Sequence, residues 1–232
     1  GRPRAHPLIV HLPTAAHLGE WAAWVPPEAE ALAEAFWPGP LTLVLPRAAE
    51  VPDAVTGGQP TVALRVPAHP VARALLSAYG DGVAAPSANR FGRISPTSAA
   101  HVAAEFPEDL LVLDGGAADV GLESTILDLT PLQRGGAPRL LRPGGVPVAA
   151  IEAVLRQRLA GPGEEGAAAG SAPAPRVPGS LSSHYAARSP TRLVEAADLA
   201  AEALRVGSGA AVLAMQGPPA GFAWRWLELP AE

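Results

Sequence analysis

The stretch VAAPSANRFGRISPTSAAH, which runs from Val83 to His101, begins like a buried strand and ends like a helix. The connection between the two is rich in polar side chains, namely Ser87, Asn89, Arg90, Arg93, Ser95 and Thr97. Connections are usually about 4 to 6 residues long, and in α/β folds the loops that follow strands carry binding residues. Serine and asparagine also favour simple turns, so this stretch by itself leaves a turn and a binding loop both open.

Further strands and helices are predicted on both sides of this stretch. Strands are expected at Leu8–Leu12, Leu41–Pro46, Thr61–Pro67, Leu110–Gly116 and Glu123–Thr130, and another ends at Arg142. Helices are expected at Glu28–Phe36, His69–Gly80, Ser95–Phe106 and Val146–Leu159. Ser95 or Thr97 is the expected N-cap of the third helix. The mixture predicts a three-layer α+β fold, in which helices flank a mixed sheet.

The amino-acid composition changes after residue 159. Residues 160–188 are rich in Gly, Ala, Pro and Ser and are predicted to be a linker between residues 1–159 and residues 189–232. Strands at 191–196 and 210–215, around a helix at 197–207, predict the start of a small Rossmann-like α/β domain. The chain starts without methionine and stops just after an apolar stretch, so we expect a fragment shortened at both ends.

The composition limits the class of protein. Hydrophobic residues make up 48% and charged residues 17% of the chain, which is typical of a globular protein. The net charge of −5 argues against binding nucleic acid mainly through bulk charge. There is no cysteine for a disulfide or a thiolate zinc site, and no apolar run approaches the roughly 20 residues of a membrane span. A cytoplasmic protein is therefore the expectation.

Several polar residues are predicted to lie at strand ends or in loops, where α/β folds place their sites. Thr61 and Arg65 are four residues apart on one strand, so their side chains face the same side. Each residue alone also has an ordinary structural explanation, such as a solvated charge, a buried histidine or a turn. The candidates are Arg2, His11, Thr61, Arg65, Ser87, Asn89, Ser95, Ser124, Thr125 and Arg142.

Taken together, seven segments resemble one family. They are GRPRAHPLIVHL, FWPGPLTLVL, TVALRVPAHP, APSANRFGRISPT, GLESTILDL, LLRPGGV and PGSLSSHYA. Their order and spacing resemble those of the YrdC-like threonylcarbamoyl-AMP synthases, and the HYA-containing linker followed by a second domain resembles the long, two-domain form. The resemblance implies a twisted mixed sheet flanked by helices.

The resemblance also implies a reaction. Such enzymes convert ATP, L-threonine and bicarbonate or CO2 into threonylcarbamoyl-AMP and pyrophosphate, with Mg²⁺ expected to accompany the ATP. Partner proteins then transfer the threonylcarbamoyl group to tRNA, so that tRNA is an indirect partner. Phosphoryl chemistry of this kind depends on positioning and cationic stabilisation rather than on a covalent nucleophile.

By the same resemblance, individual residues acquire roles. The nucleotide contacts would be Arg2, His6, Thr61, Ser87, Ser95, Arg142 and Tyr185, of which Arg2 and Ser87, with Asn89, would be catalytic. The threonine contacts would be His11, Arg65, Ala85 and Ser124. The chain departs from the family where His6 replaces an expected asparagine and Ala187 an expected proline, and it lacks the family's N-terminal Pro-Thr-Asp-Thr motif. The chain alone is therefore expected to be an incomplete enzyme.

Two other functions compete with the synthase. One is a carbamoyltransferase of the hydrogenase-maturation type, which would bring cysteine-rich zinc motifs that this chain lacks. The other is a non-catalytic RNA-binding module, against which the acidic net charge counts. Residues 178–187, with Tyr185, are further predicted to fold over the nucleotide as a lid.

Overall fold

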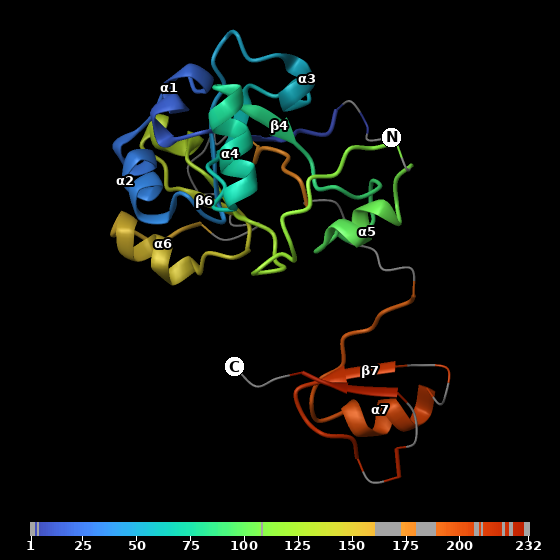
Figure 1. Ribbon diagram of the computed structural model, residues 1–232. Coiled ribbons are helices and arrows are strands. Elements are labelled where there is room, and N and C mark those ends of the chain that lie inside the picture. The colour runs from blue at the N-terminus through green and yellow to red at the C-terminus, as the bar shows by residue number, and fades with distance from the viewer. Residues whose placement is uncertain are drawn as a thin grey trace. The chain divides into compact units, whose positions relative to one another are not determined.

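The computed structural model describes residues 3, 5–107, 109–160, 173–179, 189–206, 209, 211–219, 221–222 and 225–229. The chain forms two compact units, Gly1–Ala186 and Ala187–Glu232 (Figure 1). Within the described part of the chain, no helix is long and apolar enough to cross a membrane.

The first unit is built on a six-stranded sheet. The strands are β1 (Ile9–His11), β2 (Leu41–Pro46), β3 (Thr61–Arg65), β4 (Val83–Ala85), β5 (Thr125–Asp128) and β6 (Arg139–Arg142). Their order in the sheet is β4-β1-β3-β2-β5-β6, where β1 with β3 and β2 with β5 are parallel and the other pairs are antiparallel. The predicted mixed α/β fold is confirmed.

Helices α2 (Pro27–Phe36) and α4 (Pro70–Tyr79) begin and end within a residue of the predicted bounds, whereas α6 (Val148–Leu155), which follows β6, ends at Leu155 rather than at the predicted Leu159. Helix α2 has proline and acidic residues in its first turn, which suits the free N–H groups and the dipole there. Helix α4 begins with proline and ends at Gly80, whose φ of 80° few other residues adopt. Short helices complete the described part of the unit, namely η1 (Ala15–His17), α1 (Leu18–Trp21), α3 (Asp53–Thr56), α5 (Ala99–Ala103) and η2 (Thr130–Arg134).

Alternation along the strands gives the sheet two different faces. Residues at one parity, such as Val10, Leu43 and Leu64, pack with α1, α2 and α6 in the main core. The alternate residues Ile9, Val44, Ala63 and Ile126 point to the other face, where they form a smaller cluster with Val177. The strand residues His11, Arg65 and Ala85 share the parity of Ile9 and Ala63 and therefore belong to this second face.

The segment 173–179 docks against this second face. Val177 is buried among the strand residues of the smaller cluster. The Gln59 side chain holds the neighbouring backbone twice, because its Nε2 donates to the Arg176 carbonyl at 2.9 Å and its Oε1 accepts from the Arg176 N–H at 2.7 Å. This part of the Gly/Ala/Pro-rich region is therefore fixed to the sheet, and docking begins before Pro178, where the lid was predicted to start.

The second unit contains a parallel pair of strands, β7 (Ala211–Ala214) and β8 (Arg225–Glu228), with helix α7 (Leu199–Val206). Ala203 of α7 is buried with Val212 and Ala214 of β7. The predicted strand at 191–196 is wrong: residues 191–195 have no regular structure, and Leu193 is 95% exposed. Strand β7 pairs instead with β8, which lies in the apolar stretch near the end of the chain.

Two further predictions in the first unit are wrong. The apolar run Leu110–Gly116 is not a strand, because it pairs with no strand in the described residues and Leu111 is 83% exposed. Helix α5 is also shorter than predicted, and its N-cap is Ser98 rather than Ser95 or Thr97, since the Ser98 hydroxyl accepts from the His101 N–H. Ser95 therefore does not cap the helix, and its hydroxyl donates to the Glu123 carboxylate instead.

Candidate functional site

A cleft opens beside β1 and β4 on the second face of the sheet. Its lining residues are His6, Pro7, Leu8, Ile9, Ala85, Pro86, Ser87, Glu123, Arg142 and Pro178. The structure thus brings together four of the residues predicted from the sequence, namely His6, Ala85, Ser87 and Arg142. Glu123 and Pro178 line the cleft as well and were not predicted as site residues.

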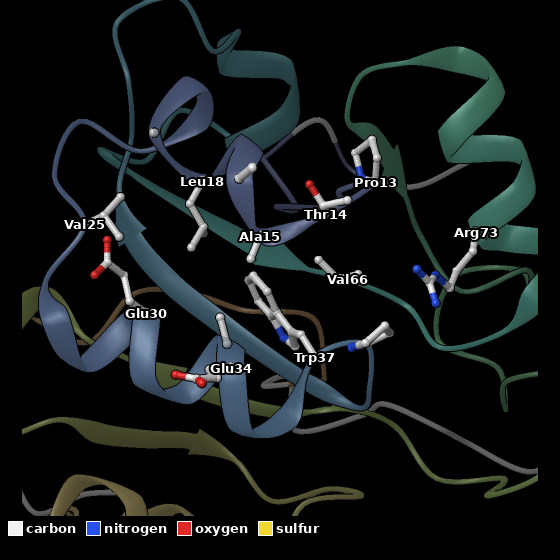
Figure 2. A pocket seen from close by; sticks show the side chains of 14 residues that line it. Pro13, Thr14, Ala15, Leu18, Val25, Glu30, Glu34, Trp37, Val66 and Arg73 are labelled. Atoms are coloured by element: carbon white, nitrogen blue, oxygen red, sulfur yellow. The ribbon is translucent and has the colours of Figure 1, made fainter.

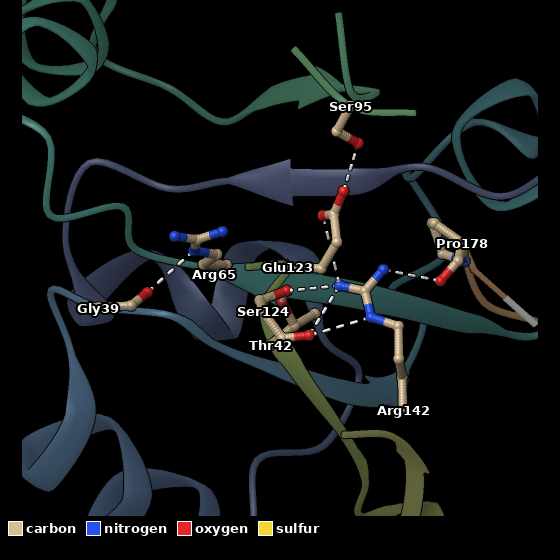
Figure 3. A network of polar contacts seen from close by, with 8 residues as sticks. All are labelled: Gly39, Thr42, Arg65, Ser95, Glu123, Ser124, Arg142 and Pro178. Atoms are coloured by element: carbon tan, nitrogen blue, oxygen red, sulfur yellow. Dashed lines mark hydrogen bonds and ion pairs between the residues drawn. The ribbon is translucent and has the colours of Figure 1, made fainter. Parts of the chain in front are cut away.

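Arg142 is the buried centre of a polar network (Figure 3). Its Nη2 donates to the Ser124 carbonyl at 2.7 Å and to the Ser124 hydroxyl at 2.9 Å, and its Nη1 donates to the Pro178 carbonyl at 2.9 Å. The Ser124 hydroxyl lies 2.8 Å from the hydroxyl of Thr42 on β2. Arg142, assigned to the nucleotide by resemblance, and Ser124, assigned to threonine, are therefore in direct contact.

Glu123 joins this network from the residue before Ser124. The Ser95 hydroxyl donates to Glu123 Oε1 at 2.5 Å, and Arg142 Nη2 lies 3.8 Å from Glu123 Oε2 (Figure 3). The carboxylate therefore connects the loop after β4 to the end of β6. Its only signal in the sequence is its place directly before the Ser-Thr pair that opens β5.

Gly144 sets the geometry around Glu123 and Ser124. A Cβ atom at Gly144 would lie 2.3 Å from the Glu123 carbonyl oxygen and 2.5 Å from the Ser124 carbonyl carbon. Such distances are impossible for a side chain, so only glycine lets the turn after β6 lie this close to the start of β5. The Gly145 N–H then donates to the Glu123 carbonyl at 3.0 Å.

Arg65 and His11 are neighbours at the ends of β3 and β1. They are direct partners in the parallel register, and Arg65 Nε donates to the Gly39 carbonyl at 2.9 Å. Burial, together with the Arg65 charge, lowers the pKa of His11 to about 4, so that the imidazole is neutral at physiological pH. Burial also lowers the pKa of Arg65, and the Glu123 carboxylate acts in the opposite direction.

The loop after β4 is held together by Asn89. Its N–H donates to the Ser87 carbonyl at 2.9 Å, and its side-chain Nδ2 donates to the Arg93 carbonyl at 2.6 Å. Asn89 is 4% exposed. Its predicted catalytic role remains a prediction, while its visible contacts shape the loop that presents Ser87.

The remaining predicted residues are more scattered. Thr61 starts β3, four residues from Arg65 on the same face, and is not among the residues that line the cleft. The His6 ring meets Phe91 edge-on at 5.2 Å between centroids. Arg2 and Tyr185 lie outside the described residues, as does most of the predicted lid.

A larger hollow of about 660 Å³ lies elsewhere, between η1, α2 and the end of β3 (Figure 2). Its walls include Leu18, Val25, Trp37 and Val66, and it contains none of the predicted site residues. Its charged groups are Glu30, Glu34 and Arg73. Size alone therefore does not identify the site, because this hollow lacks the buried convergent donors that an anionic ligand needs.

The chemistry of the cleft and its surroundings is that of an anion-binding site. The guanidinium groups of Arg65 and Arg142 and the hydroxyls of Ser87, Ser95 and Ser124 lie in or near the cleft, and these are groups that recognise carboxylates and phosphates. In the described part of the chain, no cluster of three or more His, Asp or Glu side chains could hold a metal ion. The fold and site thus define an α/β protein equipped to hold anionic small molecules.

Comparison with known proteins gives the family. The Sua5–YciO–YrdC model, described as telomere recombination, matches residues 1–144, and the model described as threonylcarbamoyl-AMP synthase, C-terminal domain, matches residues 146–227. The chain belongs to this family and has its two-domain form.

The relatives are themselves named as synthases. The threonylcarbamoyl-AMP synthase of Pyrococcus abyssi is 45% identical over 196 residues, which is 84% of this chain and 56% of that protein. The Bacillus subtilis protein of the same name is 44% identical over 160 residues, 67% of this chain and 44% of that protein. The chain thus spans about half the length of these curated relatives.

A solved structure of the Pyrococcus abyssi protein Sua5, complexed with L-threonine, resembles the whole chain. The TM-score is 0.81 at 36% sequence identity, and the match covers 100% of this chain and 68% of that one.

Proposed function

We propose that this chain is the nucleotide- and threonine-binding part of a threonylcarbamoyl-AMP synthase. The observation that carries the proposal is the contact of Arg142 with Ser124, because it joins the residues assigned to ATP and to threonine on one face of one sheet. The names of the relatives and the threonine complex of a similar structure support the same assignment.

The proposed reaction has two bond-forming steps. The neutral amine of L-threonine condenses with bicarbonate to give a carbamate and water. A carbamate oxygen then attacks the α-phosphorus of ATP, the bond from that phosphorus to the bridging oxygen breaks, and pyrophosphate leaves. Positioning the two reactants in line and stabilising charge on the phosphates account for catalysis of such a transfer.

On the threonine side, Arg65 supplies the positive charge. A guanidinium can hold the threonine carboxylate through two parallel hydrogen bonds, and Arg65 Nε is already fixed by the Gly39 carbonyl. The neutral His11 beside it can offer a hydrogen bond without adding a second positive charge. Ser124 and the backbone of Ala85 complete the set proposed for threonine.

On the nucleotide side, Ser87, Ser95 and Arg142 would bind the phosphates. Thr61, His6, Arg2 and Tyr185 would supply the other nucleotide contacts, and His6 stands in place of the asparagine expected there. Mg²⁺ would arrive with ATP, carried by its phosphate oxygens, as part of the substrate. The product would be passed to proteins that transfer the threonylcarbamoyl group to tRNA, which implies a cytoplasmic enzyme.

The proposal is tested by measuring pyrophosphate release from ATP with L-threonine and bicarbonate added singly and together, alongside calorimetric binding of each substrate to the same chain. Release that requires both, or binding of both ATP and L-threonine without turnover, supports the assignment. Release at the same rate without threonine contradicts it. Salt-dependent RNA binding without ATP binding would favour the RNA-binding alternative instead.

Residues 178–187 are proposed to close over the bound nucleotide. The hydrogen bond from Arg142 to the Pro178 carbonyl brings the start of this segment to the cleft and supports the proposal. Exclusion of water would protect the mixed anhydride product from hydrolysis. Proteolysis within residues 181–187 that is equally fast with and without ATP and threonine, together with unchanged product yield in Tyr185→Ala, would contradict it.

A further inference from the structure

Glu123 stands out because it places a negative charge in a cleft that otherwise suits anions. Its side chain is 33% exposed, whereas the Arg142 side chain that it faces is 8% exposed. A carboxylate at this position repels a phosphate group that approaches the same donors. Its presence therefore needs an explanation that the proposed reaction does not give.

In the described part of the chain, the Glu123 carboxylate contacts Ser95 and Arg142, which are groups that would also bind a phosphate. A phosphate oxygen accepts hydrogen bonds from serine hydroxyls and pairs with guanidinium groups. Glu123 Oε1 accepts from the Ser95 hydroxyl at 2.5 Å, and Glu123 Oε2 lies 3.8 Å from Arg142 Nη2. The Ser95 hydroxyl has a single proton, so it cannot donate to Glu123 and to a phosphate at once.

The backbone of Glu123 is held by a hydrogen bond, whereas its side chain is partly exposed to solvent. The Gly145 N–H donates to the Glu123 carbonyl at 3.0 Å, and Gly144 lies so close to that carbonyl that only glycine fits there. The side chain, by contrast, is partly open to solvent and holds Arg142 only at ion-pair distance. A ligand can therefore displace the carboxylate without moving the strand.

We propose that the Glu123 carboxylate is an internal stand-in for a phosphate group: it holds Ser95 and Arg142 in place in the empty cleft and is displaced when a phosphate-bearing ligand binds. The proposal rests on the proposed function, since it takes Ser95 and Arg142 as donors to nucleotide phosphate. Glu123 then sets the affinity for phosphate through competition rather than through contact.

The consequence is opposite to that of an ordinary binding residue. Glu123→Gln keeps the shape of the side chain and an oxygen that can accept from Ser95, but it removes the charge that competes with phosphate. We expect this variant to bind ATP and pyrophosphate about tenfold more tightly than the unmodified chain, a difference of ~1.4 kcal/mol. Adenosine, which has no phosphate, should bind equally to both.

The experiment is isothermal titration calorimetry of ATP, pyrophosphate and adenosine at low ionic strength. The control is Glu34→Gln, which removes one exposed carboxylate from the other hollow and leaves the cleft unchanged. Tighter ATP and pyrophosphate binding in Glu123→Gln alone supports the stand-in. Equal gains in both variants would mean that only net charge matters, and would overturn it.

The remaining outcomes are also decisive. Weaker or unchanged ATP binding in Glu123→Gln, with ATP bound by the unmodified chain, overturns the stand-in but leaves the proposed function in place. A gain for adenosine equal to that for ATP would show a change of pocket shape and would overturn it too. ATP and pyrophosphate that bind to no variant would overturn the proposed function and the stand-in together.

Discussion

Replacing Gly144 with alanine tests whether the turn after β6 sets the geometry of the cleft. The added Cβ would lie 2.3 Å from the Glu123 carbonyl oxygen and 2.5 Å from the Thr125 nitrogen. Ordinary van der Waals contacts with a Cβ atom begin at about 3.4 Å, so the turn must move away by about 1 Å. That retreat breaks the Gly145–Glu123 hydrogen bond of 3.0 Å and stretches the 3.0 Å bond from the Val146 N–H to the Thr125 hydroxyl.

The expected cost follows from these contacts. Each lost hydrogen bond is worth about 1 kcal/mol, and forcing extra volume into a packed region costs about 1 to 3 kcal/mol. Gly144→Ala should therefore lower the free energy of unfolding by about 2 to 5 kcal/mol, a large part of the 5 to 15 kcal/mol typical of a domain. It should also weaken ATP binding, because the retreat of the turn pulls Arg142, a proposed phosphate donor, away from the Ser124 carbonyl and hydroxyl that hold it in place.

Urea unfolding followed by tryptophan fluorescence measures the loss. Gly19→Ala is the matched control, because a Cβ at Gly19 meets no atom within 4 Å and alanine is favoured over glycine in a helix. The control should unfold at the same urea concentration as the unmodified chain or slightly above it. A loss below about 1 kcal/mol in Gly144→Ala would refute the role given to the close approach.

Three other predictions address the threonine side and the docked segment. Arg65→Ala should weaken L-threonine binding by about 2 to 5 kcal/mol while ATP binding changes far less, as calorimetry would show; equal losses for both ligands would contradict the assignment. Because His11 has a pKa of about 4 in the folded chain and 6.5 when unfolded, the unfolded chain binds the extra proton, and stability should fall by up to ~3 kcal/mol as pH decreases from 6.5 to 4. His11→Gln should decline less over that range, and parallel unfolding curves would count against a buried neutral histidine. Val177→Asp should release residues 173–179 from the sheet and speed proteolysis there, whereas Arg192→Asp, at an exposed site in the second unit, should not; unchanged proteolysis in Val177→Asp would argue against docking.

Apolar patterning and the position of proline predicted most strands of the sheet, because each of these strands carries those signals in its own sequence. The predicted strands at Leu41–Pro46 and Thr61–Pro67 are confirmed, since apolar side chains alternate or run through them and prolines mark their ends. The same rules failed at Leu110–Gly116, where an apolar run has the composition of a strand without a neighbouring strand to pair with in the described residues. A strand requires a partner, and one segment of sequence does not contain that information.

The site was predictable to a similar degree. The candidate residues were identified from their positions and from the family resemblance, and four of them line one cleft. Glu123 was missed because a carboxylate is not expected among donors for an anion, and its meaning depends on Ser95, 28 residues away. The docking of Arg176 was missed for the same reason: its partner Gln59 is 117 residues distant, and the composition around it is typical of a linker.

The way residues 176–178 are held implies a pattern of substitutions that evolution can accept. Gln59 binds the backbone of residue 176, and Arg142 binds the backbone carbonyl of residue 178, so most side chains at these positions would preserve these contacts and lose only the bond from Arg176 Nη2 to the Gly57 carbonyl at 3.2 Å. Proline is the exception at 176, because it has no N–H to donate. Position 177 between them must stay apolar, since its side chain is buried. We therefore expect positions 176 and 178 to vary among related sequences without releasing the segment, and position 177 to remain apolar.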